Sequence, residues 1–283
     1  MVGTRGLAHQ TGLILLLLAG VGPVVGPLQA QVRPFPYALD NRDFVHAQAV
    51  FGLAYLGYVM AGRMDPPTFD EIAELQPGDV NGFDRVATDS WSPGWQDTSD
   101  LFRNTLVASM AVVSVSPPFF GHEWSDAATL GVMSVEVMGL VFGITKVTKA
   151  LSHRPRPYLY NQELTVEERF DFAAERGGWG YQSFFSGHAT SSFAAATFVS
   201  TVFSEVYGPS PWSKVIWGAS FSAAAVATWG RVEGGAHFPT DVLVGVPVGI
   251  AIGYLVPWLH RRTADSALSI SVAPTSVRMR LTL

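Results

Sequence analysis

The sequence predicts an all-α fold: a membrane-embedded helical bundle of about five to six core helices, with an irregular N-terminal insert and a short C-terminal β-hairpin. Two compositional features support a membrane protein, because hydrophobic residues make up 48% of the chain and charged residues only 14%. Glycine and alanine are plentiful along the apolar stretches, which favours close packing of helices in or near a bilayer. One large domain is the simplest organisation for 283 residues.

Residues 1–30 have the features of a secretory signal peptide. Arg5 precedes a leucine-rich core, and Leu28-Gln29-Ala30 provides a small-residue cleavage site after Ala30. The alternative is an uncleaved anchor helix, which the short apolar core disfavours because a span prefers about 20 residues. Both interpretations predict an exported chain.

The segment 31–103 combines an N-terminal region with an insert. Residues 31–47 are polar and typical of a loop, whereas residues 48–61 are an apolar helix candidate of 14 residues. Residues 63–100 are rich in Asp, Pro and Gly, so we expect an irregular, solvent-facing insert.

The helical core is predicted over 104–262. Its apolar runs fit helices at 105–115, 127–148, 190–207, 214–229 and 241–259, separated by prolines. The tail, 263–283, alternates apolar and polar residues on both sides of an Ala-Pro-Thr-Ser turn, which predicts the β-hairpin.

Composition also excludes several classes of function. The chain has no cysteine, which excludes disulfides, thiolate nucleophiles and thiolate metal sites. A net charge of -5 gives no reason to expect nucleic acid as a partner, since binding a phosphate backbone requires a broad basic surface. The few basic residues must therefore act locally.

Three short clusters collect scarce basic residues and histidines. The chain has only three lysines and seven histidines, yet the clusters contain one of the former and two of the latter. In chain order they are Lys149 with Arg156-Pro157, Ser186-Gly187-His188, and Arg231 with His237 and Asp241. Together they predict one site that handles phosphate.

Each cluster has a physical rationale. Prolines after Lys149 break the helix, so that cations can converge on one pocket. Ser186-Gly187-His188 precedes a helix, whose free amides favour an anion. His237 and Asp241 lie four residues apart, so the carboxylate can orient the imidazole as a nucleophile. We interpret Lys146 and Arg154 as solvated or head-group-facing charges.

The clusters carry a family resemblance. Residues 149–157 match Lys-x6-Arg-Pro, residues 185–188 nearly match Pro-Ser-Gly-His, and residues 230–241 nearly match Ser-Arg-x5-His-x3-Asp. The chain resembles the type 2 phosphatidic acid phosphatase and vanadium haloperoxidase superfamily over 104–259, about half of its length. Phe185 and Gly230 depart from the pattern, where the family has proline and serine.

The resemblance implies roles for all of these residues and makes 104–262 a phosphatase core. His237 would attack phosphorus to form a phosphohistidine, Asp241 would hold its ring, and His188 would protonate the leaving oxygen. The phosphoryl oxygens would be held by Lys149, Arg156, Ser186, Gly187 and Arg231. Neither a metal nor a cofactor is expected.

The leading hypothesis is a metal-independent phosphatase that hydrolyses a phosphomonoester or diphosphate, either a lipid phosphate or an isoprenyl diphosphate. One alternative is a soluble periplasmic non-specific acid phosphatase acting on small phosphoesters. A second is a vanadate-dependent haloperoxidase, the only interpretation that requires vanadate. A third is a non-catalytic membrane scaffold that binds phosphate head groups.

Helix parity predicts the orientation. The three clusters fall on one side of the membrane, and the basic flank His260-Arg261-Arg262 favours the cytoplasmic side for the other end. We therefore expect an inner-membrane protein of the cell envelope with a periplasm-facing site. A cleaved signal agrees with this only if the helix at 48–61 does not cross.

Overall fold

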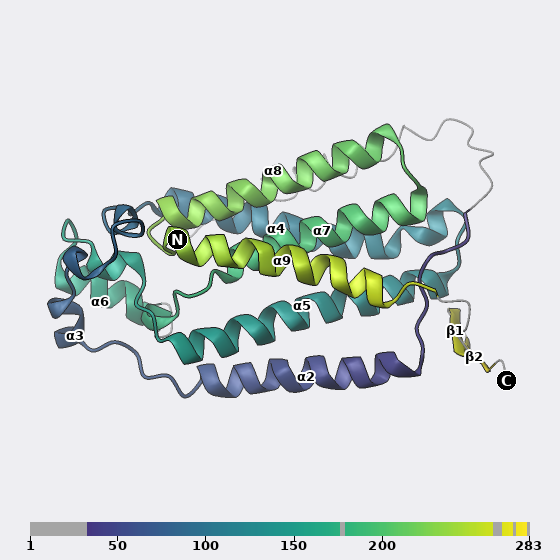
Figure 1. The fold of residues 1–283 in the computed structure, drawn as a ribbon, viewed down its shortest axis with the longest axis horizontal. Coiled ribbons are helices and arrows are strands. Elements are labelled where there is room, and N and C mark those ends of the chain that lie inside the picture. Colours follow the sequence, from purple (N-terminus) through teal and green to yellow (C-terminus); the bar gives the residue numbers. More distant parts are fainter. Residues whose placement is uncertain (1–32, 176–178, 263–267, 274–275, 282–283) are drawn as a thin grey trace, which may run out of the picture.

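The computed structural model describes residues 33–175, 179–262, 268–273 and 276–281, so the predicted signal peptide lies outside the described residues. Long helices run side by side through this part of the chain (Figure 1). They are α2 (Asn41–Ala61), α4 (Pro93–Val115), α5 (Trp124–Ser152), α7 (Gly187–Tyr207), α8 (Pro211–Glu233) and α9 (Pro239–Leu259). The predicted all-α bundle is confirmed.

Serine, proline and a left-handed residue set the ends of these helices. The Ser186 hydroxyl accepts a hydrogen bond from the backbone N–H of Ala189, 3.3 Å away, at the start of α7. Ser210 caps α8 in the same way, followed by proline at the first helical position. At the other terminus, α5 ends at His153, which adopts a left-handed conformation with φ 45°.

The core is centred on α7, which packs against α4, α5, α8 and α9. Most of its residues are buried, including several small ones that let neighbouring helices approach. Large side chains with less than 2% exposure fill the space between the helices: Phe198, Val202 and Val206 of α7, and Leu130 and Val137 of α5.

A glycine stripe brings α9 against the backbone of α7. A Cβ atom at each of these glycines would lie only 2.4 to 2.8 Å from a backbone oxygen of α7 or of its N-cap Ser186, a distance that real Cβ atoms do not reach. The glycines are Gly245, Gly249 and Gly253, each separated by four residues. This contact places the N-terminal ends of α7 and α9 beside each other.

Helix α2 is longer than predicted. It begins at Asn41 because the Asp40 side chain accepts from the backbone N–H of Arg42 and the Asp43 carboxylate accepts from that of Asp40, a capping box hidden in the polar stretch. The loop expected over 31–47 is therefore wrong from Asn41 onward. At 21 residues α2 lies alongside α5 and is long enough to cross a bilayer.

The insert is also more ordered than predicted. It contains α3 (Phe69–Glu74) and the short helices η1 (Pro77–Asp79) and η2 (Arg85–Ala87), and residues 93–100 already belong to α4. Its acidic and proline-rich composition sets helix starts, such as the Thr68 cap of α3, rather than irregular backbone.

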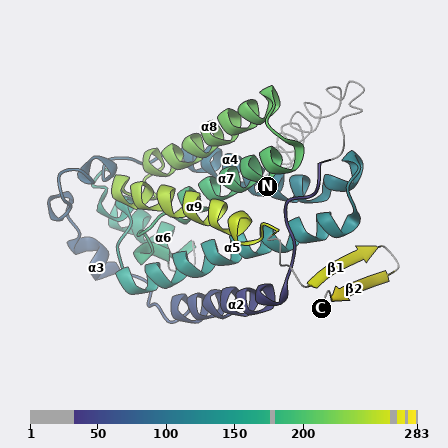
Figure 2. The same ribbon diagram turned by 45° about the vertical axis from the view of Figure 1, so that its right-hand side comes forward.

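The remaining short elements lie between the long helices. These are η3 (Pro117–Phe120), η4 (Pro157–Tyr160), α6 (Val166–Glu175) and η5 (Trp179–Tyr181). Helices α3 and α6 lie together at one end of the bundle, and the β-hairpin lies at the opposite end (Figures 1 and 2). Strand β1 (Leu268–Ala273) pairs antiparallel with β2 (Ser276–Leu281), as predicted.

The described chain has the apolar surface of a membrane protein. Three of its segments are long and apolar enough to cross a bilayer: Asn41–Ala61, Trp124–Tyr160 and Pro239–Leu259. Large apolar side chains project outward from them, such as Phe51 and Tyr55 on α2 and Trp258 on α9. Because water would penalise such an exposed belt, lipid is its natural surrounding.

Candidate active site

The three clusters meet at the end of the bundle that carries α3 and α6 (Figure 1). Lys149 lies near the end of α5, the second cluster begins α7, and the third spans the turn from α8 to α9. Helix parity alone predicted that they share one side. The packing of α9 on α7 brings them into one site.

Two cations of the first cluster are buried and held by backbone carbonyls. The Lys149 ammonium donates to the carbonyl oxygen of Gln182 at 2.6 Å. The Arg156 guanidinium donates to the carbonyl of Ala236, in the third cluster, at 3.0 Å. A carbonyl dipole positions a cation without cancelling its charge.

His237 lies at the centre of these charges and is 1% exposed. Burial lowers the pKa of His237 well below its ordinary value, and the positive charges of Arg156, Lys149 and Arg231 lower it further. The imidazole is therefore neutral, as a nucleophile must be. These electrostatic contacts join the first and third clusters in space.

Asp241 faces this imidazole from the first turn of α9. Its Oδ2 lies 3.6 Å from His237 Nδ1, too far for a hydrogen bond. The same oxygen accepts from the Phe238 backbone N–H at 2.9 Å and from the Ser183 hydroxyl at 2.5 Å. The Asp241 carboxylate is therefore fixed beside the imidazole by other donors, in position to orient it.

The second cluster has a fully buried part, Ser186, and a partly exposed part, His188. The Ser186 backbone N–H donates to the Asp241 carbonyl at 3.1 Å, and its hydroxyl caps α7, so this residue joins α7 to α9. Gly187 opens the helix, where a Cβ would lie 3.2 Å from Thr145. His188 lies closer to solvent, with its side chain 24% exposed.

Asp100 of α4 completes the mouth of the site, and sequence reasoning missed it. Its Oδ1 lies 2.6 Å from His188 Nε2 and 3.5 Å from Arg231 Nη1. Burial and the charge of Arg231 lower the pKa of His188, whereas Asp100 raises it. Burial raises the pKa of Asp100, but the hydrogen bond and charge of His188 and the charge of Arg231 outweigh burial, so that this pKa lies below its ordinary value.

The interpretation of Arg154 as a solvated charge is wrong. Its guanidinium pairs with Asp84 at 2.8 Å and with Asp241 at 2.6 Å. Lys146 is also partly engaged, since its ammonium lies 3.4 Å from the side-chain oxygen of Gln182. Asp84 and Asp241 lie 70 and 87 residues from Arg154 in the sequence. No local pattern in the sequence therefore indicated these contacts.

The two departures from the family pattern have different surroundings. Phe185 is buried, with 4% exposure. At Gly230 a Cβ would lie 2.8 Å from the carbonyl oxygen of Trp95 and 3.1 Å from the Ser99 side chain. The close approach of α4 to α8 therefore leaves no room for the serine that the pattern has there.

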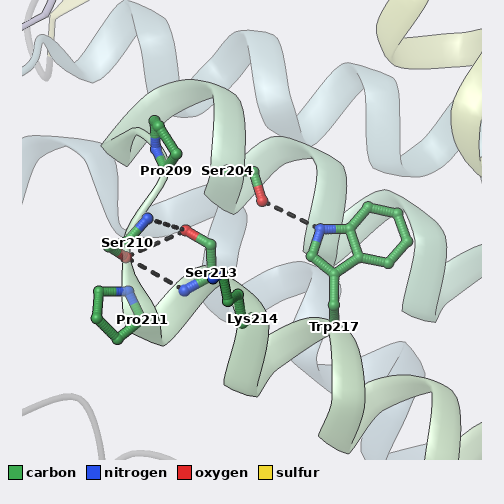
Figure 3. Close-up of a pocket in the computed structure, with 7 residues that line it drawn as sticks. All are labelled: Ser204, Pro209, Ser210, Pro211, Ser213, Lys214 and Trp217. Atoms are coloured by element: carbon green, nitrogen blue, oxygen red, sulfur yellow. Dashed lines mark hydrogen bonds between the residues drawn. The ribbon is translucent and has the colours of Figure 1, made fainter.

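A separate pocket lies at the opposite end of the bundle, beside the turn from α7 to α8 (Figure 3). It has a volume of about 450 Å³ and is lined by Ser204, Pro209, Ser210, Pro211, Ser213, Lys214 and Trp217. Its serines and its tryptophan N–H bond to one another, which leaves Lys214 as the cation of this pocket, against the three cations that act on His237.

Comparison with known proteins supports the resemblance. The sequence model of the PAP2 superfamily matches residues 131–265, a segment that contains all three clusters. The similarity predicted from the clusters is thereby confirmed for this part of the chain.

Two curated relatives match shorter stretches. The lipid A 4'-phosphatase of Porphyromonas gingivalis is 30% identical over 100 residues, 35% of this chain and 39% of that protein. The lipid A 1-phosphatase of the same organism is 36% identical over 83 residues, 29% of this chain and 17% of that protein. The matches thus span well under half the length of either relative.

Among solved structures, a transmembrane PAP2 type phosphatidylglycerolphosphate phosphatase from Bacillus subtilis aligns with a TM-score of 0.42. The sequence identity is 17%, and the alignment covers 89% of this chain and 94% of that one.

Proposed function

We propose that this chain, through its PAP2 segment, is a metal-independent lipid phosphatase that works by a phosphohistidine intermediate. The observation that carries the proposal is His237: a buried, neutral imidazole surrounded by Lys149, Arg156 and Arg231. Preorganised cations around a nucleophile stabilise the charge on transferred phosphoryl oxygens, which is the dominant contribution to catalysis of this reaction.

The proposed chemistry has two steps. His237 Nε2 attacks phosphorus while the bond to the leaving oxygen breaks, and His188 gives that oxygen its proton. Water then attacks the phosphohistidine, passes a proton to His188 and releases phosphate with His237 restored. A bound phosphate dianion would raise the pKa of His188 and so favour the protonated acid that the first step requires.

The lipid substrate is supported by the apolar belt and by the two relatives named as lipid A phosphatases. A phosphomonoester on a lipid is therefore the substrate class we propose first, and an isoprenyl diphosphate second. The exposed apolar surface counts against a soluble acid phosphatase of small phosphoesters.

The test is release of free phosphate by the purified protein in detergent, with EDTA present. We expect hydrolysis of lipid phosphates that exceeds hydrolysis of small esters, and acid-labile radiolabel on the protein after a brief reaction with a 32P-labelled lipid. Loss of all activity with EDTA would contradict the metal-independent mechanism, and halide oxidation with vanadate and peroxide would favour the haloperoxidase alternative.

His237→Ala should abolish both the phosphate release and the label. His153→Asn is the matched control, since His153 is an exposed histidine near the first cluster and Asn tolerates its left-handed backbone. Unchanged phosphate release by His237→Ala would contradict the mechanism, whereas binding of lipid phosphate without turnover by the wild type would favour the scaffold alternative.

We also propose that the site faces the periplasm, as the basic flank Arg261-Arg262 at the other end favours. With α2 crossing, residues 33–40 then lie on the cytoplasmic side, which conflicts with a cleaved signal. Because the chain has no cysteine, Arg63→Cys at the site end and Lys214→Cys at the far end can each be labelled alone. An impermeant thiol reagent on intact cells should label only the former; labelling of only the latter would reverse the orientation.

A further inference from the structure

The insert contributes a buried carboxylate to the active-site end. Asp84 lies between η1 and η2 and is 0% exposed. Its Oδ1 accepts from the backbone N–H of Thr240 at 2.9 Å, and its Oδ2 accepts from the Thr240 hydroxyl at 2.7 Å. Thr240 directly precedes Asp241, so the insert is bonded to the first turn of α9 beside the proposed catalytic pair.

Arg154 connects this carboxylate to Asp241. One terminal nitrogen, Nη2, donates to Asp84 Oδ2 at 2.8 Å, and the other, Nη1, donates to Asp241 Oδ1 at 2.6 Å. The guanidinium carbon also lies 4.2 Å from the centroid of the Phe238 ring. Hydrogen bonds from both terminal nitrogens and the ring contact on one face prevent the planar guanidinium from rotating. It therefore fixes the positions of the two carboxylates relative to each other.

The arrangement decides which oxygen of Asp241 faces the nucleophile. Oδ1 is taken by Arg154, and Oδ2 is the atom 3.6 Å from His237 Nδ1. Asp84, whose side chain is only 1% exposed, provides the second carboxylate for Arg154, whose own side chain is 24% exposed. Without Asp84, the Nη2 group of Arg154 would lose its carboxylate acceptor, and the guanidinium would be held less firmly against Asp241.

We propose that Asp84 and Arg154 are positioning residues for the catalytic pair, acting on His237 only through the carboxylate of Asp241. This inference rests on the proposed function, since it assigns these residues to the phosphoryl-transfer site. It also gives the insert a role: it supplies part of the machinery from outside the PAP2 segment at 131–265.

The test compares Asp84→Asn with Asp89→Asn, a matched control at an exposed position of the same insert. Asp84→Asn keeps the size of the side chain but replaces one acceptor by a donor that faces Arg154. We expect kcat for phosphate release to fall about 10- to 100-fold, while inhibition by orthovanadate changes less than about threefold because Lys149, Arg156 and Arg231 stay in place. Asp89→Asn should match the wild type.

Two further variants separate positioning from mere structural support. Arg154→Lys keeps the charge but cannot reach both carboxylates, so it should lower kcat to a similar extent without weakening orthovanadate binding. In an Asp241→Asn background, Asp84→Asn should have little further effect, because the carboxylate on which it acts is absent.

The outcomes are distinct from those of the proposed function. Wild-type hydrolysis that is lost in His237→Ala but retained in full by Asp84→Asn and Arg154→Lys would overturn this inference alone. Loss of orthovanadate binding and of thermal stability in both variants would likewise overturn it, in favour of a structural anchor. A wild-type protein with no phosphatase activity would overturn both proposals.

Discussion

The two ends of the bundle each bury a histidine, but they surround it with opposite charges. His237 lies among Arg156, Lys149 and Arg231 and is 1% exposed. At the far end His260 is 2% exposed, and its Nε2 lies 3.2 Å from Asp43 and 3.3 Å from Glu136. One histidine thus has cations as neighbours, and the other has carboxylates.

The difference teaches what each end is built to do. The Nδ1 of His260 lies 2.9 Å from the carbonyl oxygen of Val256, and its Nε2 faces the two carboxylates. The histidine and the acidic residues of the far end therefore contact one another within the protein. The site end instead gathers positive charge, which the proposed phosphate substrate would neutralise.

The largest expected difference between the two ends is in activity, when one arginine is removed at each end in turn. Arg156→Met should lower kcat/KM for phosphate release about 10³-fold, because a preorganised donor to the phosphoryl oxygens is lost. Arg261→Met should change it less than about twofold, since Arg261 is 41% exposed and pairs with Glu205 on the far surface. Phosphate release assays on both variants measure the contrast, and an equal loss would contradict it.

Stability should depend more on the far end than on the site end, the reverse of activity. His260→Ala should lower the free energy of unfolding by about 3 kcal/mol, because the buried carboxylate of Glu136 loses its imidazole partner and the partly buried Asp43 loses one of its contacts. His237→Ala should cost only about 1 kcal/mol, since its cationic neighbours lose no counter-charge. Denaturant unfolding in detergent micelles distinguishes them, and comparable losses would show that the ends do not differ in this way.

A smaller effect should follow from serine at two glycines of α8. Gly230→Ser restores the residue of the family pattern but should destabilise the protein by about 2 kcal/mol, because its Cβ would lie 2.8 Å from the Trp95 carbonyl. Gly218→Ser should change stability by less than about 0.5 kcal/mol, since nothing lies within 4 Å of that position. A gain in stability or activity for Gly230→Ser would refute the packing argument.

The smallest expected effect is on pH dependence. Arg231 lowers the pKa of His237, so Arg231→Met should raise that pKa and protonate the nucleophile at higher pH. The acidic limb of the kcat/KM profile should therefore move upward by up to about one pH unit. Lys214→Met, at the far end, should leave the limb unchanged. A limb that moves downward would contradict the sign of this electrostatic coupling.

The sequence predicted the three clusters of the site but not the residues that contact them from other parts of the chain. The clusters were recognisable because each is short in sequence and built from scarce residue types. Asp84, Asp100 and the role of Arg154 were not, because their contacts join residues 70 to 88 positions apart. An acidic residue in a polar segment gives no local signal of such a partner.

Helix periodicity predicted the apolar middles of the helices and missed their polar beginnings. The start of α2 at Asn41 and of α4 at Pro93 lay in segments whose charge and proline content suggested loops. Capping residues such as Asp40 and Ser92 were the available signals, since a cap explains why a helix begins among polar residues.

The glycine stripe of α9 has a consequence for how the site can adapt. Because Gly245, Gly249 and Gly253 set backbone against backbone, α7 and α9 cannot slide or repack independently. His188 at the start of α7 and His237 just before α9, the proposed general acid and the proposed nucleophile, therefore move as one rigid block. Adjustment to substrates of different shape has to occur where side chains rather than backbones meet, on α4 with Asp100 and in the insert.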